Sequence, residues 1–476
     1  MSAISPASSA ALAAGAGAGA PAAPAKSGID PRIRRLLEAP IAPTLLALAA
    51  PNMLVMVVQA SVGLIETYFV GKLGTDALAG VSLVFPVVML MQMMSAGAMG
   101  GGISASIARA LGAGRRDDAD ALTFHALAIG VVFGLAFMVG VLGGGALLYT
   151  TLGGRGASLD AALTYSNVVF AGAVLVWLFN SLASVIRGTG NMAVPAWVST
   201  LGAVVLIPLS PCLIFGWGPF PALGVAGGAV AVLAYYALGI VAFCAYLWSG
   251  KSVLRPKFKG MRFRWPLFRD ILRVGAVAAL ITVQTNLTVA IVTGLVGRFG
   301  PQAIAGYGTA SRLEYLLVPI VFGLGGPLVA MVGANIGAGQ RERALRIALI
   351  GGGLAFALTE VVGLAAAIWP LSWLGLFGHD PHMLETGAAY LRVVGPTYGF
   401  FGLGLSLYFA SQGAGRLAWP LLGGLFRMLI AVGGGWLVLT LTDSLAWAFA
   451  ALALALVVYG VTVVTAIASG VWFRTR

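Results

Sequence analysis

The chain repeats the stretch Val70-Gly71-Lys72-Leu73-Gly74-Thr75-Asp76-Ala77-Leu78-Ala79-Gly80, which returns at residues 296–306 as Val-Gly-Arg-Phe-Gly-Pro-Gln-Ala-Ile-Ala-Gly, a shift of 226 residues. A second block, Leu-Gly-Ala-Gly-Arg-Arg at 111–116, returns as Ile-Gly-Ala-Gly-Gln-Arg at 336–341, a shift of 225. A third, Arg-Gly-Thr-Gly at 187–190 with Pro195, returns as Gln-Gly-Ala-Gly at 412–415 with Pro420, again a shift of 225. Three blocks in one order, at one offset to within a residue, indicate an internal duplication.

Composition places this duplication in a membrane. Of the 476 residues 59% are hydrophobic and only 9% are charged, whereas a soluble domain averages about 25% charged residues. A membrane-spanning helix needs about 20 apolar residues. The sequence predicts twelve such helices, at about 41–70, 78–108, 121–147, 163–186, 194–215, 225–248, 274–296, 304–332, 346–369, 389–411, 419–440 and 446–471. Each copy then has six crossings, and an even number gives both copies one orientation. We expect an all-α membrane protein of twelve transmembrane helices, in two six-helix lobes related by an internal parallel repeat, an architecture typical of transporters.

The chain divides into four parts. Residues 1–30 are rich in Ala, Gly, Ser and Pro and lack the features of a signal peptide, so we expect a disordered cytosolic tail. The N-lobe should span 31–248 and the C-lobe 274–476. A cytosolic linker at 249–273 carries eight Lys and Arg residues between them.

The net charge of +13 is interpreted as a topology signal. With the N-terminus in the cytoplasm, 22 of the 28 Lys and Arg residues fall in the tail and inner connections, and four fall in the outer ones. This asymmetry favours a multi-pass protein of the plasma (inner) membrane with both termini cytoplasmic. The basic charge then suggests contact with anionic lipid, and not with nucleic acid.

We expect no cofactor and no bound nucleotide. The triplet Gly250-Lys251-Ser252 does not complete a phosphate-binding loop, because Ala245 stands where that loop needs a glycine. His379 and His382 lack a defined third ligand, so no metal site is predicted. With no soluble catalytic constellation either, an enzyme is not expected, and any active transport must draw on a gradient of a coupling ion.

Three acidic residues fall within the predicted spans, namely Glu66, Glu314 and Glu360. Because a charged group in a bilayer is costly, each is a functional hypothesis by default. Glu66 is the first candidate for ion coupling. It lies seven residues after Gln59, which lies seven after Asn52, and this spacing gives one polar stripe on the helix. The alternative for Glu66 is a structural carboxylate bonded to a neighbouring helix.

The other two acids are weaker candidates. Glu314 is the second choice for ion coupling, with structural pairing as the alternative. Arg312, two residues away, does not share its face. Glu360 has only Thr359 as an adjacent polar residue, and an isolated buried acid can simply stay protonated.

Candidate substrate-binding residues are the polar side chains of the spans, Asn52, Gln59, Asn180, Gln284 and Asn286. The alternative is that they join helices to one another, with hydrogen bonds worth about 0.6 kcal/mol each. Cys212 and Cys244 are expected to act as small hydrophobic residues.

These motifs resemble the multidrug and toxic compound extrusion (MATE) family over about residues 40–470. The resemblance rests on the Val-Gly run at 70–74, the Gly-Ala-Gly turn at 111–115, the Arg-Gly-Thr-Gly run with Pro195, and the run Pro-Ala-Leu-Gly-Val-Ala-Gly at 221–227. It implies a V-shaped pair of six-helix lobes. It also implies export of amphipathic, often cationic, small organic compounds in exchange for protons or sodium ions, by a protein expected to be a monomer.

Only some of the family's ion-site residues have a counterpart in this chain. Glu66 stands where the proton-coupled branch usually has Asp. The Asn and Asp that many members of that branch carry on the fifth span are replaced here by Leu206 and Ser210. Other members carry a Glu on the seventh span, where this chain reads Gln-Thr-Asn at 284–286, and an Asp on the tenth span, at about 389–411, which has no acid here. Either Glu66 works with other partners, Glu314 among them, or coupling has changed.

Two further functions remain open at this stage. A flippase for an isoprenoid-linked saccharide would share the two-lobed architecture, but a pyrophosphate calls for a basic cavity. The spans hold three Glu against Arg312 and Arg427. A membrane receptor or scaffold would need larger soluble loops than this chain has.

Overall fold

The computed structural model describes residues 30–257 and 262–473, apart from the side chains of Gln59, Ala60, Leu64, Tyr315 and Leu316. The tail expected at 1–30 therefore lies outside the described residues, except for Asp30. The N-lobe begins with a short helix, α1 (Pro31–Glu38). Its six crossings are α2 (Ile41–Gly71), α3 (Thr75–Gln92) continued by the π-helical η1 (Met93–Met99) and α4 (Gly100–Gly112), α5 (Arg116–Thr151), α6 (Gly156–Ala171) with α7 (Ala173–Gly188), α8 (Ala193–Phe215) and α9 (Val225–Trp248).

The C-lobe repeats this order. Its elements are α10 (Trp265–Val296) with η2 (Gly297–Phe299), α11 (Pro301–Gly337), α12 (Arg341–Ile368), the short α13 (Pro370–Leu374), α14 (Pro381–Val394) continued by η3 (Gly395–Thr397) and α15 (Tyr398–Ala414), α16 (Ala418–Met428) continued by the π-helical η4 (Leu429–Gly434) and α17 (Gly435–Thr442), α18 (Leu445–Ala468) and η5 (Val471–Phe473). Helix α10 begins nine residues before the expected start at 274, so the loop between the lobes is shorter than expected.

The described residues form eleven helices that are long and apolar enough to cross a membrane, and the bent pair α6–α7 makes a twelfth. The prediction of twelve spans in two lobes is confirmed. The pair bends by 49° at Gly172. A methyl group on Gly172 would come within 2.2 Å of the Leu233 side chain, so the glycine lets α9 pack into the bend.

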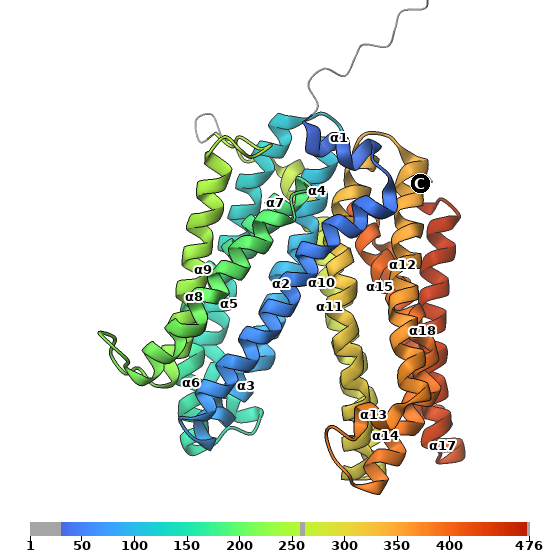
Figure 1. Cartoon of the computed structure of the whole chain (residues 1–476). Coiled ribbons are helices and arrows are strands. Elements are labelled where there is room, and N and C mark those ends of the chain that lie inside the picture. Colours follow the sequence, from blue (N-terminus) through green and yellow to red (C-terminus); the bar gives the residue numbers. More distant parts are fainter. Residues whose placement is uncertain (1–29, 258–261, 474–476) are drawn as a thin grey trace, which may run out of the picture.

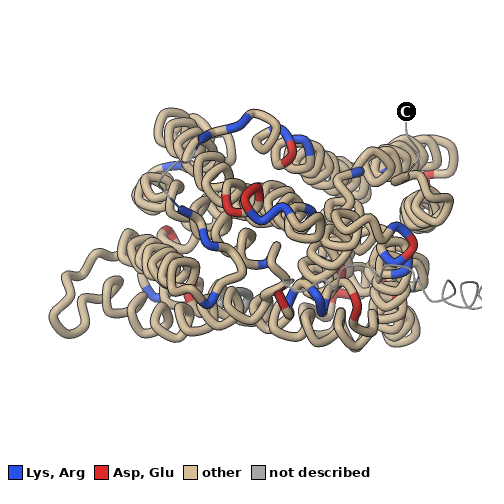
Figure 2. The backbone as a smooth tube through the Cα atoms, turned by 90° about the horizontal axis from the view of Figure 1, so that it is seen from above, with Lys and Arg blue, Asp and Glu red and all other residues tan. Residues whose placement is uncertain are grey.

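The two lobes lie close together at one end of the molecule and diverge towards the other (Figure 1). We call the first the basic end: it carries α1, residues 249–257 and 262–264, and η5. Seen from this end, Lys and Arg lie on the turns and helix ends of both lobes (Figure 2). The opposite, far end carries the turns at 72–74 and 369–380.

The lobes meet at the basic end through a symmetric backbone contact. A methyl group on Gly112 would lie 2.0 Å from the carbonyl oxygen of Ala334, and one on Gly337 would lie 2.1 Å from that of Arg109. Gly112 and Gly337 are equivalent in the repeat, and so are Arg109 and Ala334, each pair at the shift of 225. Helices α4 and α11 therefore cross at a pseudo-twofold axis, where only glycine allows so close an approach.

The π-helical segment η1 accounts for the change of repeat shift from 226 to 225. The change occurs between residues 80 and 111, so the first copy has one extra residue in its second crossing. A π-helix closes its turns at i→i+5, which takes up an added residue, and η1 at Met93–Met99 lies in that interval. In the C-lobe the equivalent region, about residue 319, holds Pro319 within α11. The regular helical hydrogen bonds are thus interrupted here in both copies, by a π-helix in the N-lobe and by a proline in the C-lobe.

Candidate functional site

Glu66 lies on α2 inside the N-lobe. Its partly exposed side chain faces Tyr165 of α6, and Tyr236 of α9 lies within electrostatic range. Its Oε1 atom is buried and has no hydrogen-bond partner. A methyl group on Gly228 of α9 would stand 3.2 Å from this oxygen, so the glycine leaves room for the carboxyl group. An acid with an unpartnered buried oxygen among phenols is suited to take up a proton, because burial disfavours the charged form of any carboxylate.

A polar network continues from Tyr236 into the N-lobe. The Gln92 amide donates to the Tyr236 hydroxyl, and Asn180 Nδ2 donates to Gln92 Oε1 at 3.1 Å and to Ser95 Oγ at 2.9 Å. Gln92 is the last residue of α3, and Ser95 lies in η1. The junction of α3 with the π-helical segment thus places both residues beside Asn180 of α7.

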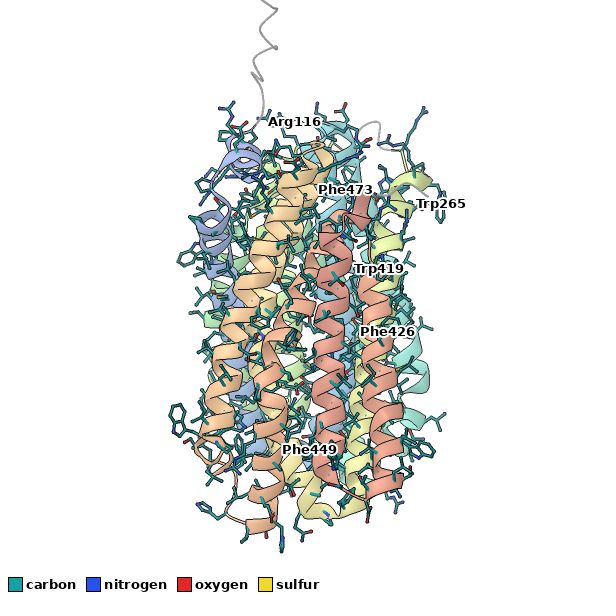
Figure 3. The ribbon with its side chains drawn as sticks, turned by 90° about the vertical axis from the view of Figure 1, so that its right-hand side faces the viewer. Arg116, Trp265, Trp419, Phe426, Phe449 and Phe473 are labelled. Carbon is teal, nitrogen blue, oxygen red and sulfur yellow. The ribbon has the colours of Figure 1, made fainter. Side chains whose placement is uncertain are left out.

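Glu314 lies on α11 in the other lobe. It accepts a hydrogen bond from the Tyr390 hydroxyl of α14. Both residues line a cavity of about 40 Å³ with Thr288 of α10 and Arg427 of α16, room for a few water molecules or a single small ion. The ring of Phe449, towards the far end in Figure 3, packs edge-on against that of Tyr390.

Arg427 provides a positive charge inside the same lobe. Its guanidinium lies over the rings of Phe401 and Tyr459, at 5.7 and 5.9 Å from their centroids, and it lines the cavity together with Glu314. The cation–π contacts hold the group in place, within electrostatic range of the Glu314 carboxyl group. The equivalent position in the N-lobe is Gly202, so this position supplies no cation there.

The two acids occupy corresponding clusters built around one repeated residue. Tyr165 and Tyr390 are equivalent at the shift of 225, and each faces the acid of its own lobe. The carboxylates themselves come from different helices, because Glu66 corresponds to Val292, which also lines the C-lobe cavity. Glu66 and Glu314 lie in separate lobes, and the structure does not bring them together.

Asn52 and Glu66, both on the predicted polar stripe of α2, contact different lobes. Asn52 is buried and its Nδ2 donates to the carbonyl oxygens of Phe322 and Gly323 on α11, at 3.0 and 3.2 Å. The amide therefore joins the lobes in this arrangement. The side chain of Gln59 lies outside the described residues.

The remaining candidates differ in their surroundings. Asn180 belongs to the N-lobe network described above. Gln284 is 8% exposed and neither amide atom has a partner, while Asn286 is exposed and donates to the Thr282 carbonyl. Glu360 Oε2 accepts from the backbone N–H of Gly399 at 2.7 Å, a structural contact to the first turn of α15. Arg312 is exposed, on a different face of α11 from Glu314.

Sequence reasoning missed Tyr165, Tyr390, Gln92 and a site role for Arg427. The repeat itself carries a signal for the two tyrosines, since both obey the shift of 225. Gln92 and Arg427 carry no such signal, because neither has a similar residue at its equivalent position. Among the described residues, no three His, Cys, Asp or Glu side chains gather as metal ligands.

Comparison with known proteins decides the family. The sequence model of the MatE family matches residues 51–212 and 278–437, one match in each lobe. This chain belongs to the MATE family. A protein of Shewanella oneidensis named "FAD transporter" is 30% identical over 79% of this chain and 82% of its own length. A "Probable multidrug resistance protein NorM" of Thermotoga maritima is 25% identical over 79% of this chain and 81% of its own length.

Solved structures share the fold. A MOP superfamily transporter from Pyrococcus furiosus superposes with a TM-score of 0.85 at 22% identity, over 94% of this chain and 99% of that one. A structure described as the outward-facing conformation of a multidrug resistance MATE family transporter gives 0.84, with the same identity and coverage. This MATE protein is a multi-pass membrane protein of a family made up of transporters.

Proposed function

We propose that this MATE protein exports amphipathic, cationic organic compounds by antiport with protons. The observation that carries the proposal is the Glu66 carboxyl group, partly exposed, with one unpartnered oxygen among the phenols of Tyr165 and Tyr236. A proton and an organic cation would compete for this carboxylate, and that competition is the simplest source of exchange. Relatives named as multidrug resistance and multidrug export proteins support the substrate class.

Protons fit the two clusters better than sodium ions. A metal ion bound next to Glu314 would share a small cavity with the Arg427 guanidinium. Two positive charges confined to so small a space repel each other strongly. A proton neutralises Glu314 without that conflict. Among the described residues, the groups placed near Glu66 are the phenols of Tyr165 and Tyr236 and the backbone of Gly228, which offer few oxygen atoms to replace the hydration shell of a metal ion.

The distribution of charge supports one membrane orientation. The basic end would face the cytoplasm by the positive-inside rule, and the far end, where the lobes diverge (Figure 1), would face outwards. Protonation of Glu66 from the outer side would release the substrate there, and the lobes would then rock about their contact near the basic end.

The test is uptake of a fluorescent organic cation into proteoliposomes, with a proton gradient and a sodium gradient imposed separately. We expect transport driven by the proton gradient alone, reduced at least tenfold in Glu66→Gln. Glu360→Gln is the matched control, because that acid contacts the backbone of Gly399 and keeps an acceptor after the change. Sodium-driven transport, or full activity in Glu66→Gln, would contradict the proposal.

A second candidate substrate is a flavin dinucleotide, favoured by the 30% identical relative named "FAD transporter". Arg427 is the charged group that would attract its pyrophosphate. The same vesicles loaded with FAD separate the two candidates: release of FAD that is lost in Arg427→Gln would support the dinucleotide. Scrambling of a labelled isoprenoid-linked saccharide would instead support the flippase considered above.

A further inference from the structure

The basic end holds a second cavity, remote from both acids. It measures about 520 Å³ and is lined by Ile41, Gly339, Gln340, Arg341, Glu342, Arg343 and Arg346; we call it the arginine cavity. Ile41 is the first residue of α2, while the other residues form the turn before α12 and its first turns. The cavity therefore lies where the N-lobe meets the C-lobe, and it is far larger than the ~30 Å³ that one water molecule occupies in the liquid.

Contacts within the protein hold two of its three arginines in place, and they leave an excess of positive charge in the cavity. Arg341 stacks on Phe473 at 5.4 Å from the ring centroid, near the basic end in Figure 3. Arg343 donates to the carbonyl oxygen of Ala39, while its Nε is buried without a partner. Arg346 pairs only loosely with Glu342, at 3.9 Å, with 73% and 90% of the two side chains exposed. The Glu38 carboxylate, at the end of α1, lies within electrostatic range of Arg343.

The equivalent turn of the N-lobe is built differently. At the shift of 225, Arg343 corresponds to Asp118 and Arg346 to Ala121. Asp118 is paired with Arg115 at 2.8 Å and with Arg264 at 2.6 Å. The N-lobe turn thus supplies its own negative charge, whereas the C-lobe turn replaces that acid with a third arginine. An external anion would provide the missing charge in the C-lobe.

The surface below the cavity indicates what carries that anion. Leu349 and Ile350 follow Arg346 by three and four residues, so they lie on the same face of α12, and both are exposed, at 38% and 37%. The exposed apolar face continues at Val361, eleven residues after Ile350 and so nearly in line with it along α12. A ligand with an anionic head and hydrocarbon chains would match both parts, the head in the cavity and the chains along α12.

We propose that the arginine cavity binds the phosphate-bearing headgroup of an anionic lipid. Arginine pairs with phosphate through two parallel hydrogen bonds, and basic pockets between helices on the cytoplasmic side are suited to such headgroups. Because Arg343 reaches the chain just before α2, a headgroup in this cavity joins the N-lobe to the C-lobe at the basic end. The lipid therefore stabilises the arrangement in which the lobes diverge at the far end.

The test measures binding of phosphatidylglycerol and phosphatidylcholine to the purified full-length protein in detergent, by native mass spectrometry. We expect phosphatidylglycerol to bind more tightly. An arginine near a membrane surface contributes about a fivefold gain in affinity, so Arg341→Gln with Arg346→Gln should lower phosphatidylglycerol affinity by roughly twentyfold and leave phosphatidylcholine unaffected. Arg346→Lys should retain part of the preference, because lysine keeps the charge but not the paired hydrogen bonds.

Arg269→Gln is the matched control, since this exposed arginine lies near the basic end on α10, outside the cavity. It should bind phosphatidylglycerol like the wild type. Equal losses in Arg269→Gln and the double variant would indicate diffuse surface attraction and overturn the proposal. Inorganic phosphate or glycerol phosphate that binds at micromolar concentration and displaces the lipid would assign the cavity to a soluble phosphate compound, and would overturn it as well.

Discussion

At the scale of single residues, Gly228 limits the space available to Glu66. A methyl group at this position would stand 3.2 Å from the buried Oε1, closer than an ordinary contact, so the carboxyl group would have to shift by a few tenths of an ångström. Misplacement of a reacting group by about 1 Å can cost a hundredfold in rate. We expect Gly228→Ala to reduce proton-driven transport several-fold, without loss of stability.

Gly140→Ala is the control for this change. Gly140 is a helical glycine of α5 whose added methyl group would meet nothing within 4 Å. It should transport normally, and it gains up to about 1 kcal/mol in helix propensity. Wild-type transport rates in Gly228→Ala proteoliposomes would show that the position of the carboxyl group does not matter.

Glu360 is expected to be structural, because it supplies an acceptor for the Gly399 N–H in the first turn of α15, where intrahelical partners are lacking. Glu360→Gln keeps an acceptor oxygen and should unfold at nearly the wild-type temperature. Glu360→Leu leaves the N–H unpaired, at a cost of about 1–3 kcal/mol. Thermal unfolding in detergent measures both. A stable Glu360→Leu that no longer transports would assign this acid to coupling instead.

At the scale of elements, Pro327 explains why Asn52 reaches across to α11. A helical carbonyl is normally bonded by the N–H four residues later, and for Gly323 that residue is Pro327, which has no N–H. The Asn52 amide donates to this freed oxygen at 3.2 Å. A proline in one lobe thus creates the acceptor that the other lobe uses.

A double-mutant cycle tests this explanation. Asn52→Leu should lower the free energy of unfolding by about 1–3 kcal/mol, because it leaves the buried Gly323 oxygen unpaired. Pro327→Ala restores the missing donor, so the double variant should regain part of that loss. Thermal or denaturant unfolding of the four proteins gives the coupling energy. Strictly additive effects would mean that the proline and the amide act independently.

The same elements show what the sequence could reveal. Hydropathy and length are enough to predict the spans, and the shift between motifs predicts two lobes. The bend at Gly172 could not be predicted, because it depends on Leu233 packing against it from α9. The stripe of Asn52 and Glu66 was predicted as one face of a helix, yet its members have partners in different lobes. Those partners are distant in sequence, so only the folded chain brings them together.

At the scale of the whole molecule, Arg109 links the lobes at the basic end. Its guanidinium pairs with Asp270 of α10 at 2.9 Å and donates to the carbonyl oxygens of Gly413 and Gln412 at 2.9 and 3.4 Å. Both carbonyls lie in the last turn of α15, where the regular intrahelical donors run out; that of Gln412 also accepts from the Gly415 N–H at 2.9 Å. One N-lobe side chain thus caps a C-lobe helix, and it can do so only while the lobes are closed at this end.

Arg109→Gln should therefore weaken the observed arrangement relative to one that opens at the basic end. Spin labels on the exposed, repeat-equivalent positions Asp160 and Glu385, with both native cysteines replaced, would report the separation of the lobes at the far end. The lost contacts are worth about 1–3 kcal/mol, enough to raise a minor state at least fivefold, so we expect a new population at shorter distance. Arg269→Gln should leave the distance distribution unchanged. An unchanged distance distribution in Arg109→Gln as well would mean that Arg109 does not hold the lobes together at the basic end. Their contact there would then depend on Gly112 and Gly337, where the backbones of α4 and α11 meet without the help of charge.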